Sequence, residues 1–269
     1  MRRTFESEED LMGLMGKVLG LQHPHEKVVE IFSRQDHRGR LLDAGAGPGV
    51  LSKRLKEAGF DVVATDINPF LFSVPEIRCE KADLNQNLPF PDESFDYILC
   101  SNTIEHLEDP YQFVRECYRI LKERGKLLIT TPNILNLKSR MANLFVGFNL
   151  FKGRPSNEVD SYQGGDHIHL ATYYELRINL HRNGFRILEA TTHRYSPTAM
   201  LLSPLYPLIF IATHRAFQRE KNPKQRERNR EILDHVLSPD LIFGKKLFLL
   251  AEKDPLYLPT QKTKGSALG

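Results

Sequence analysis

Three glycines at alternate positions, between a short apolar run and a helical stretch, constrain the fold of this chain more than any other feature. The run 40–43 predicts a β-strand, and the stretch 50–58 predicts a helix that Gly59 terminates. A strand, a glycine-rich turn and a helix in this order are typical of the nucleotide-binding unit of a parallel α/β sheet. Glycines allow a ligand to approach the backbone, and the helix start offers free N–H groups. The glycines of this loop are Gly45, Gly47 and Gly49.

Strands and helices alternate along most of the chain. The first 38 residues have helical spacing of their apolar side chains. Beyond the glycine loop we predict strands at 61–66, 77–80, 95–100, 125–131, 184–190 and 241–251, and helices at 110–122, 134–151 and 172–183. Such an alternation predicts a doubly wound α/β fold with right-handed crossovers.

The length of 269 residues suits one large α/β domain with insertions. We expect a helical cap at 1–38, a nucleotide-binding domain at 39–194 and 236–253, a helical insertion or lid at 195–235, and a flexible tail at 254–269. The net charge of +3 gives no argument for a nucleic-acid partner. The three cysteines lack metal-ligand spacing, and the first residues do not resemble a secretory leader, so we expect a cytoplasmic protein.

The spacing of the glycines indicates which nucleotide binds. A dinucleotide fold requires G-x-G-x-x-G, whereas this loop has G-x-G-x-G with Val50 at the position of the third dinucleotide glycine. The strand before the loop ends in Asp43, whose carboxylate would repel a pyrophosphate and attract a cation. S-adenosylmethionine carries a sulfonium and an α-ammonium group, so the loop favours this cofactor over NAD. A tight turn without a ligand is the alternative.

Two further acids follow predicted strands. Asp66 ends the second strand, where a carboxylate can accept hydrogen bonds from both ribose hydroxyls, and Asp83 follows the third, where it can accept from the adenine amino group. The alternative for Asp66 is a cap on the turn at Asn68, and for Asp83 an ordinary loop position. The other expected cofactor-binding residues are Ile67, Leu84 and Ser101.

Taken in order, these motifs resemble those of the class I S-adenosylmethionine-dependent methyltransferases. The resemblance covers about residues 39–190 and the last strand. It also includes the segment 88–96, Leu121-Lys122, Gly125 and the segment 131–133. It implies a seven-stranded sheet in the order 3-2-1-4-5-7-6 with strand 7 antiparallel and helices on both faces. It further implies S-adenosyl-L-methionine as cofactor and S-adenosyl-L-homocysteine as product.

Candidate catalytic residues follow the fourth strand and recur in a later segment. Glu105 and His106 stand where the family places groups near the transferred methyl, and His167 belongs to a D-H-I-H segment. Histidine is a natural general base near neutral pH, although a structural hydrogen bond is the alternative. Metal-assisted relatives carry E-x-x-E-H after strand four. Asn102 replaces the first glutamate here, so we predict no metal site.

An apolar run and a basic run are adjacent in the predicted insertion. Residues 198–213 are apolar and interrupted by Pro204 and Pro207, and residues 215–230 hold seven lysines or arginines. This combination predicts either an interfacial segment on anionic lipid or a lid followed by a solvated helix. The prolines predict two short helical pieces around a bend.

We therefore expect a methyltransferase that modifies an oxygen atom of a lipid-linked, envelope-glycan or quinone-like acceptor. A small-molecule or lipid-linked partner is expected, with peripheral membrane contact through 198–230 and without nucleic acid. The first alternative is a metal-assisted RNA or catechol-type O-methyltransferase. The second is a non-catalytic S-adenosylmethionine-binding module, against which the complete cofactor motif argues.

Overall fold

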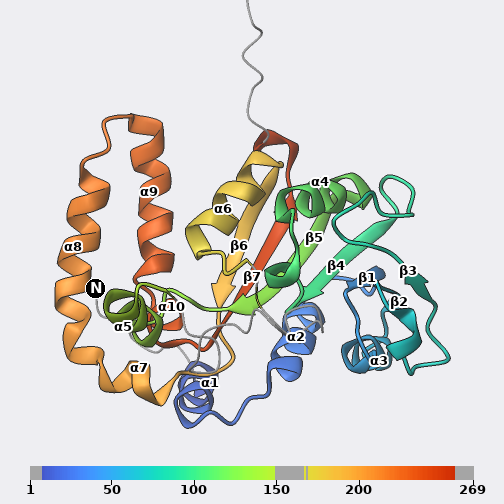
Figure 1. Ribbon diagram of the computed structural model, residues 1–269, viewed down its shortest axis with the longest axis horizontal. Helices are drawn as coiled ribbons and strands as arrows, with labels where there is room; N and C mark the ends of the chain where they lie inside the picture. Colours follow the sequence, from blue (N-terminus) through green and yellow to red (C-terminus); the bar gives the residue numbers. More distant parts are fainter. Residues whose placement is uncertain (1–7, 149–166, 168, 258–269) are drawn as a thin grey trace, which may run out of the picture.

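The computed structural model describes residues 8–148, 167 and 169–257, and its centre is a seven-stranded sheet in the order β3-β2-β1-β4-β5-β7-β6 (Figure 1). β7 pairs antiparallel with both β5 and β6, and the other pairs are parallel. This topology confirms the predicted fold class. The strands are β1 (Arg40–Ala44), β2 (Asp61–Asp66), β3 (Cys79–Lys81), β4 (Phe95–Ser101), β5 (Leu121–Pro132), β6 (Phe185–Thr191) and β7 (Lys246–Lys253).

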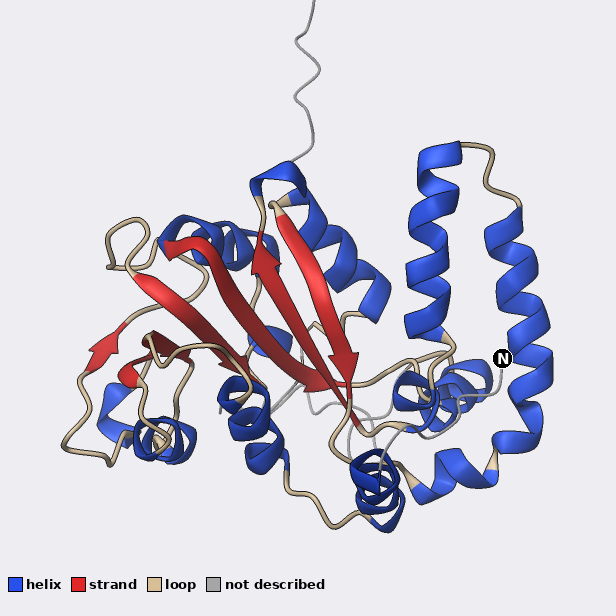
Figure 2. Cartoon of the chain, turned by 180° about the vertical axis from the view of Figure 1, so that it is seen from behind, coloured by secondary structure: helices blue, strands red, loops and turns tan. Residues whose placement is uncertain are grey.

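Helices cover both faces of the sheet, as Figures 1 and 2 show from opposite sides. One face packs on α2 and α3, and the other on α4 and α6. Leu41 and Leu42 in β1 are both fully buried but belong to opposite cores. The helices are α1 (Glu8–Leu19), α2 (Pro24–Ser33), α3 (Val50–Glu57), α4 (Pro110–Ile120), α5 (Leu137–Val146), α6 (Tyr173–Arg182), α7 (Pro197–Leu201), α8 (Tyr206–Gln218), α9 (Pro223–Val236) and α10 (Pro239–Phe243).

Local sequence explains why these helices begin where they do. Asp109 caps α4 by accepting from the Gln112 N–H at 2.9 Å, and Pro110 takes the first helical turn. α6 has the predicted capping box: Thr172 accepts from the Glu175 N–H, and the Glu175 carboxylate accepts from the Thr172 N–H. The predicted helix boundaries are therefore most accurate where a cap stands in the sequence.

Two predicted boundaries are wrong at the edges of β5 and β7. The helix predicted to reach Lys122 ends at Ile120, because Leu121 already belongs to β5. Leu121 pairs there with Phe95 of β4, and the register of the two strands shifts after this pair. The last strand was predicted from 241, yet Leu241 and Ile242 lie in α10, where both are fully buried. Ser238 caps that helix and Pro239 begins it, so local capping prevails over the apolar run. β3 also begins two residues later than predicted, at Cys79.

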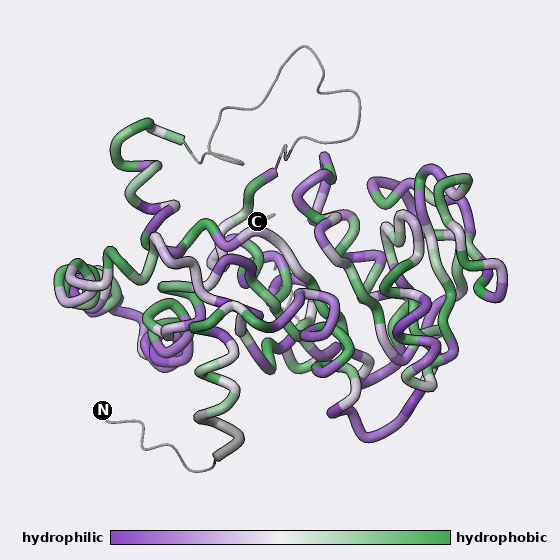
Figure 3. The backbone as a smooth tube through the Cα atoms, turned by 90° about the horizontal axis from the view of Figure 1, so that it is seen from below, coloured by the Kyte–Doolittle hydropathy of each residue, from purple (hydrophilic) through white to green (hydrophobic). Residues whose placement is uncertain are grey.

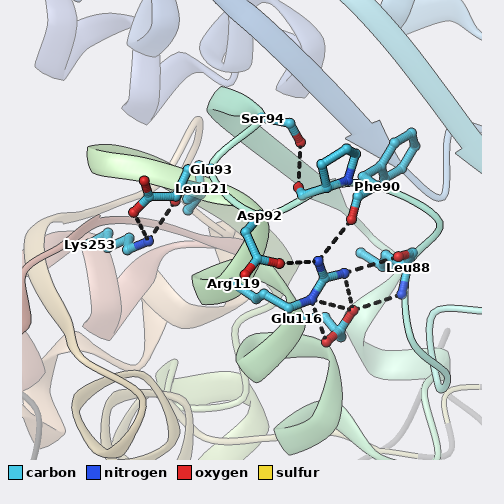
Figure 4. A network of polar contacts seen from close by, with 10 residues as sticks. Leu88, Phe90, Asp92, Glu93, Ser94, Glu116, Arg119, Leu121 and Lys253 are labelled. Atoms are coloured by element: carbon cyan, nitrogen blue, oxygen red, sulfur yellow. Dashed lines mark hydrogen bonds and ion pairs between the residues drawn. The ribbon is translucent and has the colours of Figure 1, made fainter.

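The segment 88–96, which belongs to the family resemblance, is held by one arginine (Figure 4). Arg119 on α4 donates to the carbonyls of Leu88 and Phe90 at 3.0 and 2.8 Å and to the Asp92 carboxylate at 2.7 Å. It also pairs with Glu116 at 2.7 Å, and Glu116 accepts from the Leu88 N–H at 2.8 Å. This motif is therefore architectural, since it fixes the chain entering β4 against α4.

The region predicted as an insertion is a bent chain of helices that ends in a projecting hairpin of α8 and α9 (Figures 1 and 2). Pro204 lies in a 3-10 turn, η4 (Ser203–Leu205), between α7 and α8, which confirms the predicted bend. α9 is attached to α6 because Arg177 makes two hydrogen bonds to the Glu231 carboxylate, at 2.9 and 3.0 Å. Among the described helices, none combines the length and the apolar composition needed to cross a bilayer.

Candidate functional site

The glycine loop lies at the edge of the sheet where the parallel strands end, which we call the carboxyl edge. The N–H groups of Gly45 and Ala46 both donate to the Thr65 carbonyl at 2.9 Å, so the loop folds back on β2. A Cβ on Gly45 would lie 2.4 Å from the Thr103 side chain, and one on Gly49 would lie 2.6 Å from Phe72. These two glycines are therefore required by the protein's own packing.

Gly47 differs from the other two glycines. Its φ is 53°, and a Cβ there would meet no atom within 4 Å. The backbone at Gly47 therefore faces open space, where a glycine permits close approach of a ligand. This open backbone at the start of α3 fits the cofactor that the loop predicts, since α3 begins at Val50 with Gly49 as its N-cap and no side-chain cap.

Asp43 is buried beneath this loop, with 2% of its surface exposed. One carboxylate oxygen accepts a hydrogen bond from Ser52 Oγ on α3 at 2.6 Å. The pKa of Asp43 is raised to about 6, mainly by burial and also by the neighbouring charge of Asp66, while the hydrogen bonds from Ser52 oppose this rise. A cation near the loop would favour the ionised form. Because Asp43 is buried, we expect it to act on a cationic ligand through charge attraction and not through direct contact.

The structure brings Asp66 against the same loop. One Asp66 oxygen accepts from the Gly47 N–H at 2.8 Å and the other accepts from the Asn68 N–H at 2.9 Å. The turn-capping role is thereby shown, and each oxygen keeps a further lone pair for a hydroxyl donor. Next to it, Ile67 is 64% exposed and Phe70 is 96% exposed, an apolar pair without partners in the protein core. Such exposed apolar groups beside a polar loop suit the flat face of a nucleobase.

Asp83 and Leu84 follow β3, the edge strand next to β2. Asp83 accepts from both the backbone and the side-chain N–H of Asn85, at 2.9 and 3.1 Å. Leu84 is 6% exposed and belongs to the main core, so its backbone, and not its side chain, remains for a ligand. Both residues stay predicted cofactor contacts.

The end of β4 contains a contact that sequence reasoning missed. Ser101 Oγ lies 3.1 Å from Thr130 Oγ1, and Asn102 follows with a left-handed φ of 53°. The Lys246 ammonium donates a hydrogen bond to the side-chain Oδ1 of Asn102 at 2.5 Å. Lys246 opens β7, and an antiparallel strand that starts at the carboxyl edge carries its first side chain into the site. The start of an antiparallel last strand was the signal that could have indicated Lys246.

The three predicted catalytic residues do come together. Glu105 and His106 lie in the 3-10 turn η2 (Ile104–His106), and the His169 N–H donates to the Glu105 carbonyl at 3.0 Å, which brings the later segment alongside. His167 Nε2 is 3.8 Å from Glu105 Oε1, and the rings of His106 and His167 are 4.9 Å apart. One ligand atom from each of these three residues lies within 4.8 Å of the others.

Glu105 is the most unusual group of this cluster. It is fully buried, and within the described part of the chain neither carboxylate oxygen makes a hydrogen bond of ordinary geometry. Burial raises its pKa above the usual value for a glutamate. A buried carboxyl group in this state is stabilised by a proton, a neighbouring imidazolium or a metal ion. The cluster can therefore hold a proton or a cation, and the predicted absence of metal is not tested by the geometry.

The chain resembles known methyltransferases in sequence. The family model described as "Methyltransferase domain" matches residues 42–129. A ubiquinone biosynthesis O-methyltransferase from Coxiella burnetii is 30% identical over 165 residues, which cover 58% of this chain and 68% of that protein. A protein of the same name from Xanthomonas oryzae is 32% identical over 113 residues, covering 38% of this chain and 47% of its own.

Solved structures show the same fold. An S-adenosylmethionine-dependent methyltransferase from Mesorhizobium loti superposes with a TM-score of 0.53 at 19% identity, covering 85% of this chain and 97% of that one. One from Archaeoglobus fulgidus gives a TM-score of 0.52 at 19% identity, covering 92% and 100%. The chain therefore belongs to the class I S-adenosylmethionine-dependent methyltransferases, and S-adenosyl-L-methionine is its cofactor.

Proposed function

We propose that this methyltransferase transfers the methyl group to an oxygen atom of a lipid-linked, envelope-glycan or quinone-like acceptor. The observation that carries the proposal is the cluster of Glu105, His106 and His167 at the carboxyl edge. A hydroxyl acceptor must lose its proton as the new O–C bond forms, and this cluster offers imidazole nitrogens beside a buried carboxyl group. The named relatives are O-methyltransferases, which supports an oxygen acceptor.

The chemistry requires little beyond positioning and one proton transfer. S-adenosyl-L-methionine supplies a methyl group on sulfur that an in-line nucleophile can displace. The chain's own part is to hold the acceptor oxygen in line, to exclude water and to accept the hydroxyl proton at a histidine nitrogen. The S–C bond breaks as the O–C bond forms, and S-adenosyl-L-homocysteine leaves.

Exposed apolar surface supports an amphipathic acceptor. Leu208 and Ile211 on α8 are 67% and 48% exposed, and Leu144 and Phe145 at the end of α5 are 72% and 78% exposed. Figure 3 shows this hydrophobic end of α5 projecting from the body of the molecule. The basic residues of 215–230 continue from α8 into α9. This arrangement suits a lid over the acceptor that also touches an anionic membrane surface.

The test is a screen of lipid and aqueous extracts with radiolabelled cofactor, using the parent chain and the His106→Ala and His167→Ala variants. We expect label in a hydroxyl-bearing, lipid-extractable product, and a loss of at least a hundredfold in rate in one histidine variant while S-adenosylhomocysteine still binds. Label on nitrogen, or full activity in both variants, would contradict the proposal.

A metal-assisted O-methyltransferase is the second candidate, favoured by the same three ligand atoms within 4.8 Å. Two imidazoles and one carboxylate form a ligand set that a divalent transition metal accepts. Titration of metal-free protein with Zn²⁺ and Mg²⁺ by calorimetry, with Glu105→Gln as control, tests it. Saturable binding that Glu105→Gln abolishes would support this candidate, and full activity in chelator would refute it.

A further inference from the structure

The ends of β6 and β7 gather positive charge that the proposed proton transfer does not use. Arg194 follows β6, and Lys245 and Lys246 lie at the start of β7. The Lys245 N–H donates to the Arg194 carbonyl at 3.1 Å, so these cationic residues are backbone neighbours. Lys246 pairs with Pro132 of β5 and reaches Asn102 at the end of β4. The group therefore adjoins the catalytic side of the site. We call Arg194, Lys245 and Lys246 the β6–β7 cationic cluster.

Within the described part of the chain, no carboxylate lies within ion-pair distance of this cluster. The nearby Asp240 is taken by Lys17 and Thr191, both at 2.6 Å, and by Tyr195 at 2.9 Å. Arg194 Nε is buried and has no hydrogen-bond partner among these residues. Lys246 uses one ammonium proton on the neutral Asn102 and keeps two. Arg194 and Lys246 are partly buried, whereas Lys245 is exposed. Partly buried cations without a carboxylate partner are costly, so Arg194 and Lys246 indicate an anion that arrives from outside.

His193 precedes Arg194 in the chain, and its pKa responds to the positive charge of the cluster. It is 2% exposed, its ring packs on Phe248, and within the described residues its Nδ1 has no partner. The pKa of His193 is lowered to about 3, mainly by burial and also by the positive charges of Arg194 and Lys246. The imidazole therefore stays neutral and adds a polar group that can donate or accept a hydrogen bond.

The N-terminal helices cover this region. The Tyr195 N–H donates to the Lys17 carbonyl at 2.9 Å, and an added Cβ on Gly20 would meet Arg194 Cδ at 3.7 Å. The connection from α1 to α2 thus lies against Arg194 and shields it from bulk solvent. A shielded charge interacts more strongly with an anion than an exposed one does.

We propose that the β6–β7 cationic cluster binds an oxyanion of the methyl acceptor, either a carboxylate or a phosphate group. The proposal rests on the proposed function and narrows it, because it selects acceptors that carry an acid beside the methylated hydroxyl. A guanidinium presents a planar fork that matches carboxylate and phosphate oxygens, and an adjacent ammonium adds a point charge.

The experiment uses the full chain saturated with S-adenosylhomocysteine. Phenyl phosphate, benzoate and neutral phenol are titrated by calorimetry, because they share one ring and differ in the charged group. We expect at least one of the anions to bind at least tenfold more tightly than phenol, and the tighter of the two identifies the source of the oxyanion. The Arg194→Met/Lys246→Met variant should lose at least tenfold of that affinity.

Two control variants keep the result specific. Arg115→Met/Lys122→Met removes the same amount of charge from α4 and from the start of β5, away from the cluster. This variant should bind the anion as the parent does. Arg194→Lys/Lys246→Arg keeps the charge and should recover most of the affinity. The inference is overturned if neither anion binds better than phenol, or if both methionine variants lose affinity equally. Absence of S-adenosylhomocysteine binding would instead refute the proposed function itself.

Discussion

The cofactor side and the acceptor side of this sheet are built by different kinds of contact. Around β1 and β2, the glycine loop is fixed by hydrogen bonds between neighbouring turns, such as Gly47 N–H to the Asp66 carboxylate at 2.8 Å. Around β6 and β7, the site is assembled from segments far apart in the chain, such as Asn102 and Lys246. The cofactor side is thus held by contacts between neighbouring segments of the chain, whereas the acceptor side forms only when distant segments come together.

The difference extends to the surfaces. The core beneath the glycine loop is closed, with Leu41, Leu55 and Ala64 fully buried. In contrast, no residue of α8 is buried, although this helix is largely apolar. Tyr206, Ile209 and Phe217 of α8 pack against the body of the protein, whereas Leu208 and Ile211 stay exposed. Exposed apolar side chains of this kind are typical of a surface that meets a ligand, a lipid or another molecule. We assign the first region to the cofactor, and under the proposed function the second region belongs to the acceptor.

The largest expected effect separates two glycines of the same loop. Gly45→Ala forces a Cβ to within 2.4 Å of Thr103 at a φ of 79°, so we expect a loss of about 3 kcal/mol in the free energy of unfolding. Gly47→Ala meets no atom within 4 Å and should cost only about 1 kcal/mol, for its positive φ, while cofactor affinity falls at least tenfold. Denaturant unfolding and calorimetry with S-adenosylhomocysteine measure the two quantities. Equal destabilisation by both variants would contradict the assignment of Gly45 to packing and of Gly47 to ligand approach.

A second pair of variants compares Arg119, which holds the segment 88–96 against α4, with Arg177, which holds α9 against α6. Arg119→Met leaves the Glu116 carboxylate without its main partner, and because Arg119 is 30% exposed we expect a loss of about 2 kcal/mol. Arg177→Met should release α9 from α6, because Arg177 joins Glu231 and Tyr173. Hydrogen exchange should show faster exchange of α9 in Arg177→Met alone, with cofactor binding retained. If Arg177→Met weakened cofactor binding as much as Gly47→Ala, the two sides would not be independent.

The third prediction concerns Asp66, which accepts from the Gly47 N–H and is expected to bind the ribose hydroxyls. Asp66→Ala should weaken S-adenosylhomocysteine binding by about 1.5–3 kcal/mol, or roughly ten- to hundredfold, because a charged acceptor is lost. Asp66→Asn keeps one carbonyl acceptor and should lose less. Calorimetry on both variants decides the matter, and an unchanged dissociation constant in Asp66→Ala would leave this residue as a turn cap alone.

The smallest expected effect is a pH dependence of cofactor binding through Asp43. Its pKa is raised to about 6 in the free protein, and a cationic ligand prefers the ionised carboxylate. Affinity should therefore be constant above about pH 7 and fall as pH drops through 6, by at most tenfold per pH unit. Asp43→Asn should abolish this dependence and bind more weakly at pH 8. A parent and variant with the same pH profile would exclude Asp43 as the sensing group.

The accuracy of the sequence predictions follows the same division. The strand 61–66 was predicted with the bounds that the structure has, and the strand order was correct. Glu105, His106 and His167 were predicted from two separate segments, and the structure brings them together. The partner of Asn102 was not predicted, because the last strand was predicted to begin at 241, five residues before Lys246, where β7 begins.

The sequence alone determined the features that depend on spacing within one turn or one crossover. The glycine spacing, the acids that end strands and the capping box of α6 act over three to twenty residues, where backbone geometry leaves few alternatives. Only the tertiary structure decided which charges share a site. Arg194 and Lys246 are 52 positions apart, and the antiparallel pairing of β6 and β7 makes them neighbours. Electrostatic and packing energies depend on distance in space, so a cluster built from the ends of two strands appears only once the sheet has formed.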